Sequence, residues 1–215
     1  MKNHLLLLVG FAIQAAVNPL LGASGSKPVP ISDGRTFHGW EGDTNTTWRI
    51  ENGAFVGGSL RTKVPHNEFL CTKRSYTNFV LRLKFKLVGT EGFINGGVQV
   101  RSKHITNPSY ELSGYQADLG DPTWWGCLYD ESRRNKVLVQ SKIEDVKKVL
   151  KPNEWNDYEI RCEGKRIRLS INGVETVDYT EADDSIPQHG IIGIQIHGGG
   201  IAEASYKNLT IEELP

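Results

Sequence analysis

Polar side chains that form short, directional hydrogen bonds occupy alternate positions in three stretches of the 215-residue sequence. They are Asn95, Gln99, Arg101, Gln116, Asp118, Gln195 and His197. A solvated sheet face more often carries Lys, Glu and Thr. If the three stretches are neighbouring strands, these groups collect on one face and suit a hydroxyl-rich ligand. The alternative is that the strands are not neighbours, which would make these ordinary surface residues.

A second candidate region is the segment 121–134, which is dense in aromatic and charged residues. Trp124 and Trp125 are adjacent there, and their rings could stack on the apolar face of a sugar. Tyr129, Glu131 and Arg133 follow within a few positions and are candidates for the wall of the same site. The alternative is that the two Trp side chains close the end of a hydrophobic core, with the charged groups in water.

The elements that must position these residues are mainly β-strands. Residues 79–87 alternate strictly between apolar and charged side chains, which is typical of a half-buried strand. The pair Asn172-Gly173 between two such runs indicates a hairpin. Many short antiparallel strands predict an all-β jelly-roll sandwich of two sheets. One short helix is expected near 141–150, with Ser141 and Glu144 at the spacing of a capping box.

Composition excludes several classes of function. The 25 basic residues balance 25 acidic ones, so no overall field attracts nucleic acid or an anionic membrane. Three cysteines allow at most one disulfide and show no metal-binding spacing, and small buried hydrophobes are the simplest interpretation. We therefore expect no metal site and no cofactor. The pattern makes no prediction of oligomeric state.

The N-terminus reads as an export signal. Lys2 is followed by an apolar run over 5–17 and then by small residues at 22–25. The predicted organisation is a signal peptide over 1–23 and a single domain over 24–215. The mature protein would then be periplasmic or extracellular, with no membrane association after removal of the signal.

The order and spacing of eight short elements resemble the 3-keto-disaccharide hydrolase family across residues 31–214. The matching elements span residues 48–53, 78–83, 95–101, 114–115, 126–129, 155–156, 171–173 and 190–197. Many members of that family have Glu and then Gln at the positions of Gln116 and Asp118. The resemblance implies a concanavalin A-like, laminarinase-like jelly roll.

The activity implied by the resemblance is cleavage of glycosides already oxidised at C3, so a small saccharide is the expected partner. The C3 ketone acidifies the C2 proton, and the resulting enolate expels the C1 substituent; water addition then completes hydrolysis. On this hypothesis His197 or Asp118 is the base, Arg101 holds the enolate oxygen, and Glu131 or Tyr129 protonates the leaving group. Other residues would bind or orient the sugar: Asn95, Gln99, Gln116, Gln195, Trp124, Trp125 and Arg133.

Two other functions fit the same pattern. A non-catalytic, lectin-like carbohydrate-binding module would use the same amides and Trp side chains without needing a tuned base. A structural or adhesion domain would show neither sugar binding nor turnover. Neutral amide substitutions at Asp118 and His197 distinguish the first two functions, because they preserve binding but abolish turnover in an enzyme.

Overall fold

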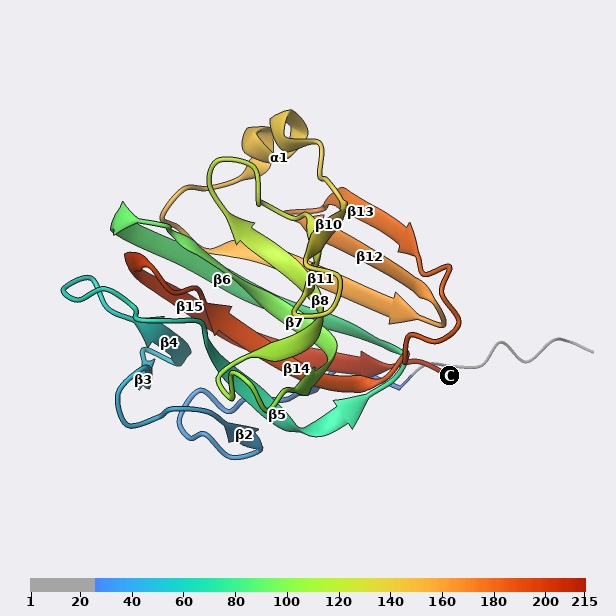
Figure 1. Cartoon of the computed structure of the whole chain (residues 1–215), viewed down its shortest axis with the longest axis horizontal. Coiled ribbons are helices and arrows are strands. Elements are labelled where there is room, and N and C mark those ends of the chain that lie inside the picture. Colours follow the sequence, from blue (N-terminus) through green and yellow to red (C-terminus); the bar gives the residue numbers. More distant parts are fainter. Residues whose placement is uncertain (1–25) are drawn as a thin grey trace, which may run out of the picture.

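The computed structural model describes residues 26–215, which form fifteen strands and one helix (Figure 1). The predicted signal peptide over 1–23 lies outside the described residues. Within residues 26–215, no helix has the length and apolar character needed to cross a membrane.

The strands form two antiparallel sheets that face each other, here called sheet A and sheet B (Figure 1). Sheet A runs in the order β13 (Val174–Thr180), β12 (Arg166–Ile171), β11 (Asn156–Glu163), β6 (Phe79–Gly92), β15 (Gly200–Glu213), β4 (Ala54–Gly58) and β3 (Trp48–Glu51), with β1 (Val29–Pro30) beside β15. Sheet B runs in the order β10 (Lys136–Val139), β9 (Leu128–Glu131), β8 (Leu112–Gly120), β7 (Asn95–His104), β14 (Gly190–Ile196), β5 (Glu68–Tyr76) and β2 (Trp40–Glu41). This is the jelly-roll sandwich that the strand pattern predicts.

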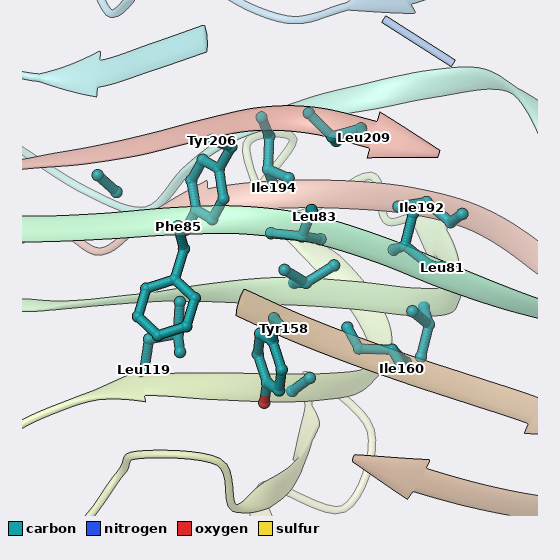
Figure 2. Close-up of a cluster of buried hydrophobic side chains, with 14 of the residues drawn as sticks. Leu81, Leu83, Phe85, Leu119, Tyr158, Ile160, Ile192, Ile194, Tyr206 and Leu209 are labelled. Atoms are coloured by element: carbon teal, nitrogen blue, oxygen red, sulfur yellow. The ribbon is translucent and has the colours of Figure 1, made fainter. Parts of the chain in front are cut away.

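The core lies between the two sheets. Leu81, Leu83 and Phe85 come from alternate positions of β6 and are almost fully buried, as the alternation predicts. They meet Ile192 and Ile194 of β14 from sheet B (Figure 2). Burying a side chain of this size stabilises the fold by about 1.5–3 kcal/mol. Sheet B therefore turns one face to the core and leaves its other face for a different use.

Helix α1 (Ile143–Val149) lies at the predicted place, but the expected capping box is wrong. The residue before the helix is Lys142, and no side chain caps the N-terminus. The Ser141 hydroxyl instead donates to the Trp125 carbonyl at 2.7 Å. That hydroxyl is used to anchor the helix to the loop after β8.

The three cysteines, Cys71, Cys127 and Cys162, are all free and buried. Burial raises the pKa of each thiol, to about 12 for Cys71 and Cys162. All three behave as small core hydrophobes, which agrees with the interpretation of the sequence.

Candidate functional site

The outer face of sheet B carries the predicted polar side chains, because β8, β7 and β14 are neighbours in that order. In the register of these strands, Gly97 of β7 stands opposite both Asp118 of β8 and Gln195 of β14. Two strand spacings of about 4.8 Å put the Cα atoms of Asp118 and Gln195 about 10 Å apart. Gly97 has no side chain, and the Gln116 side chain lies over it, because a Cβ at Gly97 would be 3.0 Å from Gln116 Cγ. We call the set Asn95, Gln99, Gln116, Asp118 and Gln195 the polar face.

Hydrogen bonds hold most of the polar face in place. Asn95 Nδ2 donates to Asp118 Oδ1 at 2.9 Å, and the Leu119 N–H donates to the same oxygen at 3.0 Å. In the next row, Gln99 Nε2 donates to Gln116 Oε1 at 3.0 Å. These bonds fix the Asp118 carboxylate from one side.

Gln195 differs from its neighbours because its amide is buried and unpaired. The residue has 0% exposure, yet neither its Oε1 nor its Nε2 has a hydrogen-bond partner in the described part of the chain. Asn95 Oδ1 is buried and unpaired as well. Buried polar groups in native proteins are nearly always bonded, so these unpaired atoms make Gln195 and Asn95 candidate ligand-binding residues.

The loop over 105–111, between β7 and β8, covers part of this face, and we call it the covering loop. Its Tyr110 ring stacks on His66 with ring centroids 4.0 Å apart. At its end, Glu111 accepts a hydrogen bond of 2.7 Å from Asn67 Nδ2. Leu112 then packs with Phe69, Cys71 and Ile191 in a small apolar cluster. The loop therefore lies against the outer-face cluster of β5 and β14, beside Phe69 and Cys71.

An arc of aromatic rings borders the other side of the polar face. Phe93 meets His197 edge-on at 4.7 Å and Trp124 at 6.3 Å between ring centroids. Trp124 in turn meets Tyr129 at 6.0 Å. We call His197, Phe93, Trp124 and Tyr129 the aromatic arc. Apolar ring faces beside hydrogen-bonding groups are the combination that sugar rings require.

Two carboxyl groups near the arc hold their protons unusually strongly. Burial raises the pKa of Asp118 to about 7, although the bonds from Asn95 and Leu119 oppose the shift. Burial, together with the charge of Glu111, raises the pKa of Glu131 to about 7. Carboxyl groups tuned to this range can exchange protons with a substrate near neutral pH.

His197 is held as a neutral ring with one nitrogen free. Burial lowers the pKa of His197 below its ordinary value of 6.5. Its Nδ1 lies 2.6 Å from the Gly198 carbonyl, which can only accept, so Nδ1 carries the hydrogen. The Nε2 atom therefore presents a lone pair and accepts a proton or a hydroxyl hydrogen.

The structure does not place Arg101 on the polar face, so its predicted position is wrong. A bulge between Val100 and Lys103, with Arg101 at a φ of 50°, breaks the alternation of β7. The guanidinium instead donates to the Thr77 carbonyl at 2.7 Å and the Gly164 carbonyl at 2.6 Å. Thr77 lies in the connection from β5 of sheet B to β6 of sheet A, and Gly164 lies in the turn between β11 and β12 of sheet A, so Arg101 ties the two sheets together at one end.

Two further residues predicted to bind sugar also lie away from the polar face. Trp125 is only 7% exposed and stacks on Phe85 of the core at 6.2 Å. Trp125 therefore closes the end of the hydrophobic core, as the alternative interpretation predicts, whereas Trp124 lies on the aromatic arc. The Arg133 guanidinium lies over the Tyr115 ring at 4.4 Å and pairs with Asp130. The side chains of Asp130 and Tyr115 point to the core side of sheet B, whereas Asp118 points to the outer face. Arg133 contacts the first two and therefore lies away from Asp118.

Sequence reasoning missed three residues that shape the site, namely Phe93, Asn67 and Glu111. Phe93 lies in the turn between β6 and β7, and Asn67 and Glu111 lie in loops. Strand periodicity says nothing about loop side chains, so no signal in the sequence pointed to them. Throughout residues 26–215, no three His, Cys, Asp or Glu side chains are grouped so that they could bind a metal ion.

Comparison with known families settles the relationship of the chain. The model of the 3-keto-alpha-glucoside-1,2-lyase-like domain matches residues 27–212. The chain belongs to this family. The match confirms the resemblance inferred from the eight short elements and covers every residue of the polar face. A comparison of this chain with curated proteins found no match.

Several solved structures share the fold of this chain at low sequence identity. A candidate glycosyl hydrolase from Parabacteroides distasonis is 19% identical with a TM-score of 0.65, covering 87% of this chain and 94% of that one. The carbohydrate-binding module CBM66 from Bacillus subtilis is 18% identical with a TM-score of 0.63, covering 81% and 96%. A β-glucanase from Bacillus licheniformis is 12% identical with a TM-score of 0.54, covering 90% and 100%. These likenesses establish the glucanase-like jelly roll.

Proposed function

We propose that the protein cleaves 3-keto glycosides by removing the C2 proton and eliminating the C1 substituent. One observation carries the proposal: Asp118, with its raised pKa, shares a row of the polar face with the unpaired Gln195 amide, and the Gln116 side chain lies over Gly97 between them. The elimination requires a base beside the C2 hydrogen and a hydrogen-bond donor beside the C3 oxygen. The family's description as lyase-like supports the same chemistry.

In the proposed reaction, Asp118 is the base. Its carboxylate takes the C2 proton, and the electron pair of the C2–H bond forms an enolate with its charge on the C3 oxygen. A pKa of about 7 makes Asp118 a stronger base than His197, whose pKa is lowered below 6.5. His197 Nε2 then accepts a hydrogen from a sugar hydroxyl.

The enolate oxygen needs a donor, and Gln195 takes the role that the sequence suggested for Arg101. Gln195 Nε2 is buried and unpaired, so it donates without first breaking another bond. Arg101 donates instead to the backbone carbonyls of Thr77 and Gly164 at the end of the sandwich. A neutral donor in a buried site still stabilises a developing oxyanion strongly, because water is excluded there.

The register favours Tyr129 over Glu131 as the acid. Tyr129 stands opposite Gln116, two residues from Asp118, whereas Glu131 stands opposite Gly114, four residues away. At about 3.4 Å per residue, Glu131 lies about 7 Å further along the sheet. As the enolate pair returns to form the C1–C2 double bond, the C1–O bond breaks and the leaving oxygen takes the Tyr129 hydroxyl proton. Addition of water across that double bond would complete net hydrolysis.

Isotope exchange separates these roles. In D2O, Tyr129→Phe is expected to exchange the C2 hydrogen of a 3-keto disaccharide while its cleavage slows at least tenfold. Asp118→Asn is expected to lose both exchange and cleavage. Asp157→Asn, an exposed carboxylate on β11 of the other sheet, is the control and should keep both activities. Exchange that survives in Asp118→Asn would remove Asp118 as the base.

A carbohydrate-binding module is the second candidate function. The unpaired amides and the aromatic arc would bind a sugar without any chemistry, and CBM66 shares the fold. Saturable binding of saccharides without turnover of any 3-keto glycoside would favour this function over catalysis.

We also propose that the protein is exported and acts in the periplasm or outside the cell. The charged start, apolar run and small residues of positions 1–25 support this placement. N-terminal sequencing of the protein recovered from the producing cells tests it. A mature N-terminus near residue 24 is expected.

A further inference from the structure

A separate cleft of about 400 Å³ opens at the end of sheet B opposite to His197. Its walls come from the ends of β5, β7, β8 and β14, from the loop before β14 and from the turn after β9. The polar face leads toward it, because Ser102 lines the cleft and its hydroxyl donates to Gln99 Oε1 at 2.6 Å. None of the proposed catalytic groups lines this cleft.

The cleft is lined by basic side chains and by no carboxylate. Lys103, His104, Arg133 and His189 line it together with Arg101. The chain as a whole has a net charge of zero, so the excess of positive charge is confined to this cleft. Lys103 is exposed and has no ion-pair partner among residues 26–215, whereas His104 contacts Glu41. A concave surface with one sign of charge attracts ligands of the opposite sign.

Arg101 contributes a buried cation without an anionic partner. The residue is 3% exposed, and all its hydrogen bonds go to neutral acceptors, including the Gln188 side chain at 2.5 Å. Desolvation lowers the pKa of its guanidinium, and no nearby carboxylate opposes that effect. Buried charges are normally paired, so an anion bound in the cleft would supply the missing compensation.

Arg133 is presented to the cleft by its neighbours. Its Nε donates to Asp130 at 2.7 Å, and the guanidinium rests on the Tyr115 ring at 4.4 Å. Its buried Nη2 lies 2.7 Å from the same Asp130 carboxylate, in a geometry that does not make a hydrogen bond. Hydroxyl groups of Ser75, Ser113 and Ser132 line the same cleft as additional donors. Fixed guanidinium and hydroxyl donors are the groups that bind the oxygens of sulfate, phosphate and carboxylate.

We propose that this cleft is a binding site for an oxyanion, either free or carried by a saccharide that extends from the polar face. The lining without carboxylates, the uncompensated Arg101 and the pre-positioned Arg133 all favour an anionic group over a neutral sugar. Four residues of β8 separate Asp118 from Gly114, which is about 14 Å and roughly the span of two or three sugar units. The site needs no catalysis, so it is independent of the proposed elimination.

The test is a nuclear magnetic resonance titration of the purified protein with four probes. These are inorganic sulfate, inorganic phosphate, glucuronate and, as the neutral comparison, glucose. Backbone amide signals report where each probe binds, which avoids the general stabilisation that sulfate gives to folded proteins. Saturable shifts confined to residues such as Lys103, Ser113 and His189 are expected with the anions and not with glucose.

Lys103→Gln is the informative variant, because this exposed side chain has no structural partner. It is expected to weaken anion binding about tenfold, the effect of removing one charge-assisted hydrogen bond. Lys151→Gln removes the same charge from the turn after α1 and should bind like the unmodified protein. Tighter binding of glucuronate than of sulfate would identify a saccharide-borne anion, and the reverse order a free one. Absence of saturable shifts in the cleft, or equal binding by Lys103→Gln, would overturn the proposal.

Discussion

At the scale of single residues, Asp118 has a protonation equilibrium that opposes folding at neutral pH. Burial raises its pKa in the folded protein to about 7, from an ordinary value of 3.8. The folded state therefore keeps its proton over a range in which the unfolded chain has already lost it. Stability falls as the pH rises from about 4 to about 7 and remains lower above that range. A buried carboxyl group that lowers stability at neutral pH is a candidate functional residue.

Asp118→Asn should therefore stabilise the protein while inactivating it. The amide keeps an oxygen for Asn95 Nδ2 and the Leu119 N–H but carries no charge. We expect the variant to be more stable by roughly 1–3 kcal/mol at a pH of about 8, with the difference vanishing near pH 4. Urea denaturation at both pH values measures this. A difference of equal size at both values would contradict the raised pKa.

The pH dependence of turnover provides a second prediction from the same group. Asp118 must be deprotonated to take the C2 proton, so kcat/KM should rise with pH through about 7 in the unmodified protein. Asp118→Asn should lower kcat/KM by at least about 100-fold and remove that rise. A profile that stays flat between about pH 5 and 8 would exclude Asp118 as the base.

Truncation of the two adjacent Trp residues should have different main effects. Trp125→Ala should mainly lower stability, whereas Trp124→Ala should mainly raise KM. Trp125→Ala removes a core ring packed on Phe85 and is expected to destabilise the protein by about 3–5 kcal/mol. Trp124→Ala removes an arc ring and is expected to raise KM severalfold with a smaller loss of stability. Denaturation and steady-state kinetics on both variants check this. Equal losses of stability would show that Trp124 is also a core residue.

At the scale of elements, strand periodicity was sufficient wherever a strand is regular. The faces of β6, β8 and β14 follow from alternation, because one face of each must enter the core. The bulge in β7 could not be predicted, since it inserts residues without a distinctive sequence. That single irregularity moved Arg101 from the polar face to the end of the sandwich.

The covering loop is a second feature that strand periodicity cannot predict. Its residues have no repeating pattern, and its path across the outer face depends on contacts such as Tyr110 on His66. The strand pattern predicts the polar face, but it predicts neither the loop nor the burial of the Asp118 carboxyl and the Gln195 amide.

Weakening the attachment of the covering loop should change its motion without unfolding the sheets. Tyr110 is 42% exposed, so Tyr110→Ala is expected to increase hydrogen exchange over 105–111 while β7 and β8 remain protected. Tyr110→Phe keeps the stacked ring and serves as the matched control. If exchange in the loop is the same in both variants, the stack on His66 does not hold the loop.

At the scale of the whole molecule, the sandwich separates stability from function. Sheet A and the inner face of sheet B supply the core, so the outer face of sheet B is free to carry polar groups that the fold does not need. Proteins that share this fold include a β-glucanase and a carbohydrate-binding module, so the fold alone does not determine the activity. The activity must be argued from Asp118, Gln195 and Tyr129.

The measurement that tests the central claim most directly compares two substrates. The purified protein is incubated with a 3-keto disaccharide and, in parallel, with the same disaccharide before oxidation, while release of the second sugar is followed. Because only a C3 ketone acidifies the C2 proton, we predict cleavage of the keto form alone. Cleavage of both forms would indicate a conventional glycosidase, and cleavage of neither, with saturable binding, would indicate a carbohydrate-binding module. Either of those results would contradict the proposed elimination.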